Sequence, residues 1–533
     1  MMPALSTVMI AARTVLLCGL AMPALAQQAP QDGTPAAPVT PATPAAPVTS
    51  GELSAEVGEH GQRSGHASVA RDQQGLSLDA ALDLVRNGNY LDGSVFLERS
   101  ASLGAEWKSR QGRFGFSADK VEQDTRYPAP FSALKALAWT QASWPDDRYR
   151  YDVSRASAFV QRYVGNMELG VEATLREKRA QATYAGDTGS DVSSYRSRQL
   201  QLAPRLRHYG KLGTVGTDTE LGVDLMQWER RTARSTDSSA SDLKRRQHAR
   251  ALLLREELAF GGVHAPRLLL GLRREQFHLD PSDLPAGGSD WENQRAWDLQ
   301  GSFLLRPDTS VYAKTARSYR IDDDGYTSAG YRPLAGQLRY QREVGLNWSG
   351  KDRSASLRLF SERLLTRIVF DQSLVELNQQ GFAGNLEPAR RDGVAIEAGM
   401  VLSPAWRIEG QLQQAHARYE DYPYDGADIA LVPKTLATAR LYWTPPGRST
   451  ADLGVQWLRA LRYGNDFDNS CLAQVPAFAT LDGHYGYKVG AWQLELAASN
   501  LTDRRHYGNA RACRSSIYQN DTRQLRLSAR YQF

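Results

Sequence analysis

The sequence predicts an all-β fold, a transmembrane antiparallel β-barrel of about 22 strands, from three observations. Residues 525–533 alternate strictly between apolar and polar side chains and end on Phe533. Successive side chains of a strand point to opposite faces, so one face of this segment is apolar and the other carries Arg526 and Arg530. Comparable runs recur from residue 51 onward, joined by connections that are alternately short and long. This pattern is typical of bacterial outer-membrane barrels.

The composition is compatible with this prediction. The mean hydropathy is −0.48 and charged residues make up 23% of the chain, which by itself favours a soluble protein. A barrel needs apolar side chains only at every second strand position, whereas a membrane-spanning helix needs about 20 apolar residues in sequence. The 64 basic and 59 acidic residues are spread along the chain. They form no basic stripe, so we expect no nucleic-acid partner.

The first 50 residues predict an export signal and a linker. Residues 1–26 resemble a secretory signal peptide, with Arg13, an apolar core at 14–25 and an Ala-Leu-Ala cleavage site before Gln27. Residues 27–50 are rich in proline, alanine and threonine, and the heptad TPAAPVT occurs at 34–40 and again at 43–49. Such a segment favours an extended spacer. We therefore divide the chain into 1–26 signal peptide, 27–50 linker and 51–533 barrel.

Each strand of the barrel is predicted from its own alternating run. For example, the apolar residues Leu453, Val455 and Trp457 alternate with polar Asp452 and Gln456, so the two sets point to opposite faces of one strand. The strands begin near residues 51, 64, 75, 93, 112, 148, 166, 195, 216, 244, 266, 294, 309, 336, 353, 384, 405, 433, 450, 475, 491 and 521. An even number places both barrel ends on one side, which we predict to be periplasmic, with Phe533 at that rim.

The connections divide into two classes. The predicted short turns are 73–74, 110–111, 165–166, 262–263, 307–308, 351–352, 403–404, 446–447 and 489–490. The predicted long outer loops are 126–147, 186–194, 280–293, 320–335, 372–384, 420–432, 464–474 and 503–520. Aromatic residues near strand ends predict interfacial girdles. They are Tyr90, Trp107, Trp228, Tyr340, Trp348, Tyr442, Trp443, Tyr485 and Tyr487.

Five segments resemble the β-barrel of TonB-dependent outer-membrane receptors, in the order of that family. They are ELSAEVG (52–58), QDTRYP (123–128), NLEPA (385–389), NLTDRRHY (500–507) and RYQF (530–533). Ala389 departs from the pattern, because the family usually has glutamate there. The resemblance covers 51–533 and implies 22 strands, a place in the outer membrane and uptake of a small chelate such as a siderophore or vitamin-like cofactor.

The resemblance also exposes a difference. In that family a plug domain precedes the barrel and fills it, and carries a segment that engages TonB. Here barrel-like sequence starts near residue 51, directly after the linker, so we expect the plug to be absent. A barrel of this size has a lumen that wall side chains alone do not fill. The resemblance thus implies a separately encoded plug or TonB-linked partner, besides a small-molecule ligand, outer-membrane lipid and the barrel-assembly machinery.

Candidate site residues fall into three groups. Cys471 and Cys513 are the only cysteines of the mature chain and lie in two outer loops, which predicts a disulfide; the alternative is two free thiols. The loop residues Asp322, Asp323 and Asp324 are a weak metal candidate, because an EF-hand needs a longer set of spaced ligands. The polar residues that we expect to face the lumen and shape its field are Arg273, Asp452, Asp482, His484, Gln493, Glu495, Arg526 and Arg530.

The sequence carries no nucleophile elbow, zinc motif or phosphate loop, so we expect neither an enzyme nor a bound cofactor. The favoured hypothesis is a receptor-derived uptake barrel. Two alternatives stay open: a passive porin-like channel, and a surface scaffold that binds a partner with its long loops.

Overall fold

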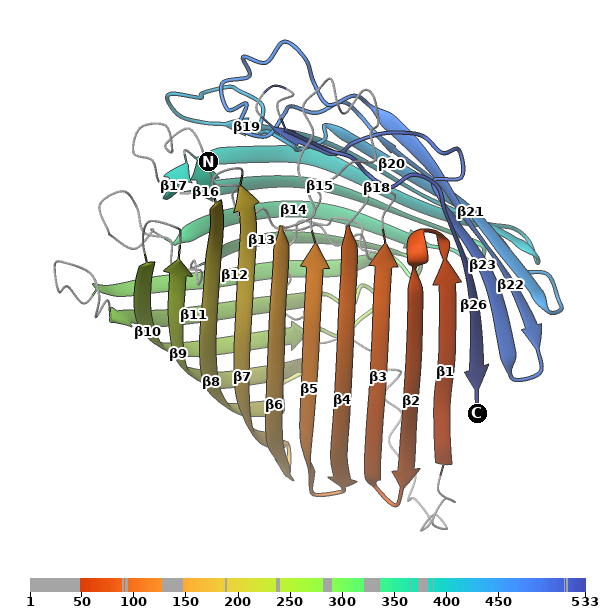
Figure 1. Cartoon of the computed structure of the whole chain (residues 1–533). Coiled ribbons are helices and arrows are strands. Elements are labelled where there is room, and N and C mark those ends of the chain that lie inside the picture. Colours follow the sequence, from red (N-terminus) through yellow and green to blue (C-terminus); the bar gives the residue numbers. More distant parts are fainter. Residues whose placement is uncertain are drawn as a thin grey trace.

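The computed structural model describes residues 48–88, 91, 94–126, 147–186, 189–235, 240–280, 290–320, 336–365, 367–371, 382–386, 388–511, 513 and 516–533. Of the 26 strands in these residues, 22 form one antiparallel sheet that closes on itself (Figure 1). The predicted all-β barrel and its number of strands are therefore confirmed.

The first half of the sheet contains the longest strands. It comprises β1 (Val48–Gly58), β2 (Arg63–Gln73), β3 (Leu76–Gly88), β4 (Val95–Ser109), β5 (Gly112–Arg126), β6 (Arg148–Val164), β7 (Met167–Gly186), β8 (Gly189–Leu212), β9 (Val215–Ser235), β10 (Ala240–Ala259) and β11 (Arg267–Asp280). One short 3-10 helix, Glu59–Gly61, joins β1 to β2. None of the described helices has the length and apolarity needed to cross a membrane.

The second half completes the wall. It comprises β12 (Asp290–Arg306), β13 (Thr309–Arg320), β14 (Gln337–Ser349), β15 (Arg353–Leu365), β18 (Ala389–Ser403), β19 (Trp406–Tyr419), β20 (Thr435–Trp443), β21 (Ser449–Leu458), β22 (Phe478–Val489), β23 (Trp492–Ser499) and β26 (Gln524–Gln532). Two small hairpins lie in the loops, β16 (Arg367–Asp371) with β17 (Phe382–Leu386) and β24 (Asn509–Arg511) with β25 (Ser516–Tyr518). The described residues contain no separate folded domain.

The first and last strands pair to form a seam that closes the barrel. β1 and β26 are antiparallel from Glu52↔Gln532 to Gly58↔Arg526 and lie side by side in Figure 1. Beyond this ladder, the Gly51 N–H donates to the Phe533 carbonyl at 2.8 Å and the Phe533 N–H donates back at 3.1 Å. The alternating C-terminal segment is thus the closing strand that the sequence predicted.

Predicted and observed strand starts agree within six residues, and two of the differences change an expectation about a loop or a segment. The predicted loop 186–194 is wrong, because β7 and β8 stay paired as far as Gly186↔Gly189. A hairpin needs only a two-residue connection, so the serine-rich residues there continue the ladder. At the other difference, β1 begins at Val48, and three residues of the predicted linker lie in the first strand.

Apolar and polar side chains alternate across the wall. On β3, for example, Leu82 and Leu84 are 61% and 52% exposed. Tyr90 lies outside the described residues. Six of the other predicted girdle aromatics have the phase of the outer face: Trp107, Tyr340, Trp348, Trp443, Tyr485 and Tyr487. The girdle prediction is wrong for Trp228 and Tyr442, which have the phase of the inner face. Their cross-strand partners, Gln199 and Arg407, share that phase.

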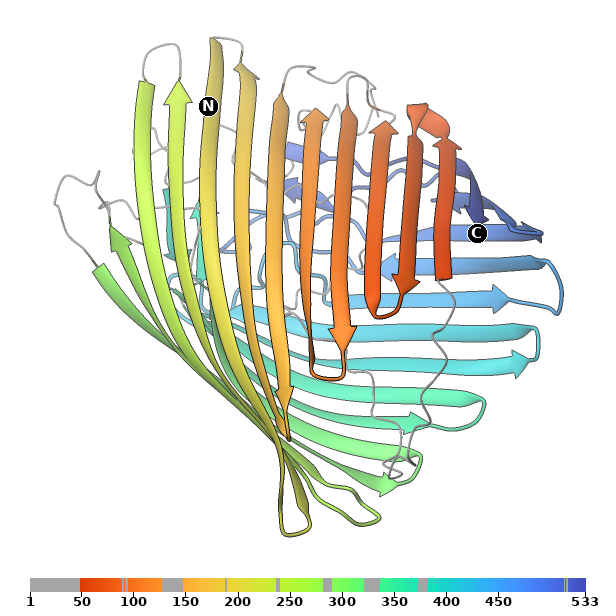
Figure 2. The same cartoon turned by 90° about the horizontal axis from the view of Figure 1, so that it is seen from below.

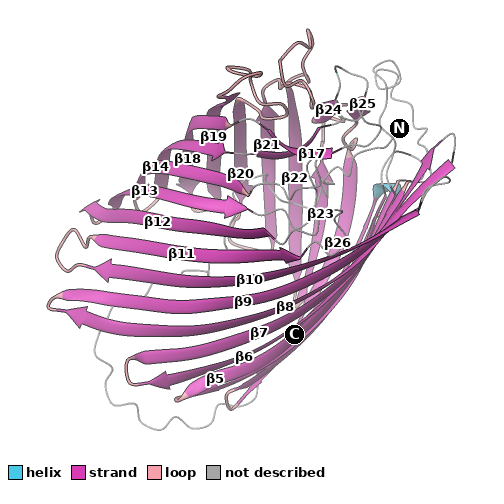
Figure 3. Cartoon of the chain, turned by 90° about the vertical axis from the view of Figure 1, so that its left-hand side faces the viewer, coloured by secondary structure: helices cyan, strands magenta, loops and turns pink. Residues whose placement is uncertain are grey.

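The β8–β9 ladder has a gap at Pro204, which we call the break; on their other side Ala203 and Pro204 stay paired with Glu172 and Val171 of β7. β8 and β9 pair as far as Leu202↔Leu225 and again from Arg205↔Gly222, which leaves Ala203 and Pro204 outside the ladder. Proline has no N–H to donate. The Arg205 guanidinium donates instead, to the Val223 carbonyl at 2.7 Å and the Pro204 carbonyl at 3.0 Å. Figure 3 shows the long strands of this region crossing the wall obliquely, and Figure 2 shows that they end in a projecting corner.

Candidate functional site

The polar face of the strands is the inner face of the barrel. On this face, side chains from strands that are not neighbours meet: Arg440 on β20 contacts Asp482 on β22, and Asp224 on β9 contacts Arg273 on β11. The concave side of a curved sheet brings such side chains together. We call this surface, opposite the exposed leucines, the inner face.

Three of the predicted lumen residues form one cluster with a residue that the sequence did not single out. Arg440 donates to Asp452 from one side and to Asp482 from the other. The His484 ring lies 3.0 Å from the Asp452 carboxylate and 3.4 Å from the Arg440 guanidinium. One arginine thereby holds two acidic residues of neighbouring strands together, which like charges alone would oppose.

Predicted Arg273 belongs to a larger network that extends from the Pro204 break. Its guanidinium donates to Asp224 at 2.5 Å and to Glu275 at 3.0 Å. Asp224 also accepts from Arg205 at 2.5 Å, so one carboxylate joins two arginines. Tyr319 accepts from Arg273 at 3.1 Å and donates to Glu275. The network therefore connects β8, β9, β11 and β13.

Small side chains on β10 make room for this network. Ala249 and Ala251 face inward and are each only 2% exposed, and Ala251 stands directly between Asp224 and Glu275 in the register. On β9, a Cβ at Gly222 would lie 2.7 Å from Arg205 Cδ. Alanine and glycine at these points leave the space in which the charged side chains reach across a strand.

A third cluster covers β13 to β18. Tyr312 donates to Glu343 at 2.6 Å, and Arg358 lies 3.3 Å from the same carboxylate. On neighbouring strands Arg339 and Arg391 contact Glu362 at 2.5 Å and 4.0 Å. Each buried carboxylate of the inner face is thus matched by an arginine or a tyrosine, as the low dielectric of the wall requires.

The remaining predicted lumen residues lie at the seam. Arg530 is 3.2 Å from Glu52 across the β1–β26 pairing, and its side chain is 47% exposed. Gln493 and Glu495 are the cross-strand neighbours of Arg530 and Ser528. Arg526 pairs in register with Gly58, and its side chain would meet a Cβ at that position. The structure therefore divides the eight predicted residues among three places instead of one ring.

Cations and aromatic rings gather on the inner face of β6 to β9. The Lys178 ammonium lies 5.4 Å from the ring centroid of Tyr151 and 5.3 Å from that of Tyr195. The Arg230 guanidinium lies over Tyr195 at 4.0 Å. Cations over ring faces are attracted by the ring quadrupole. Tyr151, Lys178, Tyr195 and Arg230 form what we call the cation–aromatic patch.

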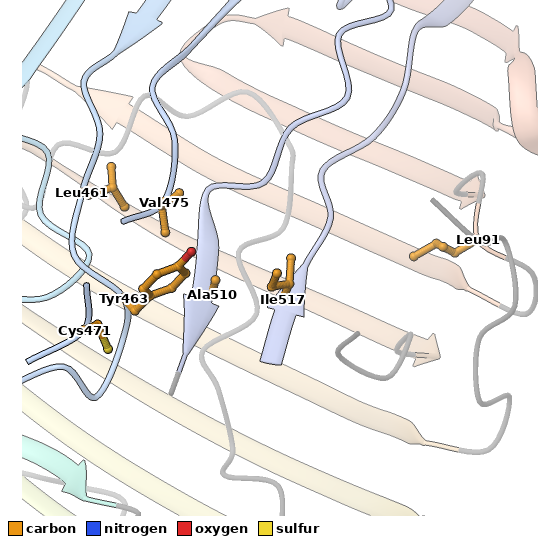
Figure 4. Packing of buried hydrophobic residues seen from close by; sticks show 7 residues of the cluster. All are labelled: Leu91, Leu461, Tyr463, Cys471, Val475, Ala510 and Ile517. Atoms are coloured by element: carbon orange, nitrogen blue, oxygen red, sulfur yellow. The ribbon is translucent and has the colours of Figure 1, made fainter. Parts of the chain in front are cut away.

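The predicted disulfide is present. Cys471 bonds to Cys513 with 5.4 Å between the Cα atoms, and it ties the loop between β21 and β22 to the loop between β23 and β26. Figure 4 shows the apolar cluster beside it, in which Tyr463 and Val475 are fully buried. Leu91, from the connection between β3 and β4, belongs to the same cluster. These loops therefore form a packed cover next to the seam.

Burial shifts the pKa values of two titratable groups in this cover. His506 packs on Phe478 with ring centroids 4.3 Å apart, and burial lowers the pKa of its imidazole. Burial raises the pKa of the Asp521 carboxyl, which lies just before β26. Both groups are thus held toward their neutral forms.

The structure describes one of the two groups of possible metal ligands. Asp322, Asp323 and Asp324 lie outside the described residues. Asp466, Cys471 and Cys513 lie close together, but both sulfurs are committed to the disulfide. The buried Asp466 carboxylate accepts from the Cys471 N–H at 3.0 Å and lies 3.8 Å from Arg462. Its role is therefore to fix the loop.

Sequence reasoning did not single out Arg205, Asp224, Tyr319 or Arg440, nor the third cluster and the cation–aromatic patch. Strand phase could have placed Asp224 and Arg440 on the polar face. The proline at 204 in an otherwise regular strand is a signal for Arg205, since it marks a missing donor. The contacts that skip a strand depend on the curvature of the wall, which no local pattern encodes.

Comparisons with known proteins agree with this geometry. Residues 58–501 match the model of the family described as TonB dependent receptor-like, beta-barrel. No curated protein sequence matches the chain. Among solved structures, the chain is similar to the ferric yersiniabactin uptake receptor FyuA from Yersinia pestis (15% identity, 91% of this chain and 80% of that chain, TM-score 0.75). It is also similar to the siderophore receptor PiuA from Acinetobacter baumannii (13%, 92% and 82%, 0.77) and to the copper transporter OprC (14%, 91% and 80%, 0.76). At these identities the likeness shows the fold.

Proposed function

This chain belongs to the TonB-dependent receptor-like β-barrel family, and we propose that it takes up a small chelate across the Gram-negative outer membrane with the help of a separate polypeptide. The family and fold are those of outer-membrane receptors and transporters, not of enzymes. The observation that carries the proposal is the closed 22-stranded wall with its charged inner face. Such a wall surrounds a hydrated path.

The need for a partner is supported by what the described residues contain. Outside the wall they form loops and two small hairpins, and a barrel of this width is not filled by its own wall side chains. A plug or TonB-linked protein supplied by another chain would close the path and select the solute. The rim that bears the short turns, near which Phe533 lies, is the periplasmic one in this proposal.

The cation–aromatic patch supports an anionic chelate as the solute. The Lys178 ammonium lies beside the rings of Tyr151 and Tyr195 on the inner face and presents positive charge there. Such a surface attracts a chelate that carries negative charge. FyuA and OprC, by their descriptions, handle a ferric chelate and copper.

The proposal is tested by uptake and by partner capture. A strain that lacks the barrel should lose accumulation of at least one labelled ferric chelate or vitamin, and Lys178→Gln should reduce accumulation while Lys211→Gln, at the periplasmic end of β8, should not. A tagged barrel crosslinked in its own cells should capture a second polypeptide. Normal accumulation of a broad panel of chelates without the barrel would contradict the proposal.

A passive channel is the second candidate, and one observation favours it. Within the three clusters the acidic and basic residues neutralise one another, which leaves these parts of the inner face without strong selectivity for one sign of charge. In that case small solutes would enter the strain in proportion to their size, and no partner would be captured.

A further inference from the structure

The outer face of the wall contains a groove that runs from β6 to β12. Its volume is about 1030 Å³, and its lining is mostly apolar, with Val171, Leu206, Leu252, Leu272 and Trp297. These side chains have the outward phase; Leu252 and Leu272 are 62% and 44% exposed. The groove therefore opens toward the lipid that surrounds the barrel.

The groove coincides with the break in the wall. Pro204 and Gly222 belong to its lining, and they flank the point where β8 and β9 lose their ladder. The network of Arg205, Asp224 and Arg273 lies behind this point on the inner face. The inner ion pairs thus lie directly behind the gap in the β8–β9 ladder, on the opposite side of the wall from the groove.

Two arginines stand at the loop-side end of the groove. Arg274 on β11 and Arg295 on β12 are direct cross-strand partners, both are exposed, and both line the groove. Like charges directly opposite each other destabilise a sheet. Among the described residues, neither arginine has a carboxylate within ion-pair distance. The pair therefore lacks, within the described chain, an anion that would offset this repulsion.

A second outward arginine pair shows the contrast. Arg363 on β15 and Arg390 on β18 are also direct cross-strand partners. Arg363 contacts Glu420 at 2.5 Å and Arg390 contacts Asp392 at 2.8 Å. In that pair the protein supplies both counter-charges, and neither arginine lines the groove.

We propose that the groove binds a phosphorylated glycolipid of the lipid A type from the outer leaflet, with acyl chains along Leu252, Leu272 and Trp297 and a phosphate between Arg274 and Arg295. The arginine fork matches phosphate oxygens in a bidentate manner. The orientation proposed above places this end of the groove toward the cell surface, where that glycolipid lies. The proposal concerns lipid on the outer face and is independent of which solute crosses the barrel.

Native mass spectrometry of the full barrel, purified in a mild non-ionic detergent and titrated with purified lipid A, tests the proposal. The wild-type barrel should retain one lipid A at low excess. The double variant R274Q/R295Q should retain it with about ten-fold lower affinity, since two charge-assisted contacts are lost. The matched control R363Q/R390Q removes the same charge from the same face and should bind as the wild type does. Folding of each variant is checked by the compact migration of the unheated barrel in gel electrophoresis.

Three outcomes would overturn the proposal. They are equal lipid A binding by R274Q/R295Q and the wild type, an equal loss in R363Q/R390Q, and a stronger arginine-dependent retention of phospholipid in a parallel titration with phosphatidylglycerol. Failure here leaves the uptake experiments unaffected, because those report on the inner face.

Discussion

The seam between β1 and β26 and the break in the β8–β9 ladder at Pro204 are two places where the wall needs more than regular pairing of strands that follow each other in the chain. At the seam the backbone holds it: seven residue pairs continue the ladder, and the Arg530–Glu52 ion pair at 3.2 Å is partly exposed. At the break, the Arg205 guanidinium replaces the missing backbone donor by donating to the Val223 carbonyl. The side chain of its ion-pair partner Asp224 is only 12% exposed. The seam therefore depends on geometry and on the loops above it, whereas the break depends on charge.

The disulfide beside the seam should make the largest contribution to the free energy of unfolding. Cys471→Ser with Cys513→Ser should lower the free energy of unfolding by about 3–4 kcal/mol, because the bond closes a segment of 42 residues and restricts the unfolded chain. Urea unfolding of the refolded barrel in lipid bilayers measures this. The wild-type barrel under reducing conditions should match the variant. A change within about 1 kcal/mol would mean that the packed cover does not need the bond.

Removing the side-chain donor at the break should have the next largest effect. Arg205→Ala leaves the Val223 carbonyl without its donor and Asp224 with Arg273 alone, so we expect a loss of about 2–3 kcal/mol in the same measurement. The matched control Arg530→Ala removes an exposed arginine at the seam and should cost less than about 1 kcal/mol. Equal losses in the two variants would remove the distinction between the two regions.

At the seam, a steric substitution should lower the free energy of unfolding more than the removal of a charge does. A Cβ at Gly51 would meet the Phe533 ring, so Gly51→Ala should cost about 1–3 kcal/mol by overpacking. Gly65→Ala on neighbouring β2 is the control, because its nearest atom would be 3.9 Å away. If Phe533→Leu restores the stability of Gly51→Ala in unfolding by urea, the ring contact is the cause. Equal unfolding of the two glycine variants would show that the ring moves aside freely.

The contrast also explains what the sequence could and could not predict. The seam was predictable, since the alternation in 525–533 fixes both the strand and its faces. Cys471 and Cys513, the two cysteines after the predicted signal peptide, indicated the disulfide. The same strand alternation predicted that the side chains of Arg273, Asp452 and Glu495 lie on the inner face. The break was not predictable in this way, because Arg205, Asp224 and Arg273 belong to three strands and meet only where the wall curves around β10. Tyr319 reaches Glu275 across β12, where β12 and β13 are no longer paired.

The smallest expected effect concerns pH and the cover beside the seam. Burial against Phe478 lowers the pKa of His506 below its unfolded value of about 6.5, so the unfolded state binds more protons in that range. The stability that His506 contributes is present above the unfolded pKa and is lost as the pH falls through the folded pKa. Hydrogen exchange of the loop between β23 and β24 should therefore speed up, after correction for the intrinsic rate, between pH 7 and pH 5. His506→Gln should abolish this dependence, and a dependence that survives the substitution would contradict the assignment.

The central claim is that the charged inner face surrounds a path for solutes, and single-channel conductance of the refolded barrel in a planar bilayer tests it most directly. The barrel on its own, without any partner, should give discrete and large current steps that are proportional to voltage. Barrel that migrates as a folded species and is inserted in the bilayer, yet passes no current, would contradict the claim.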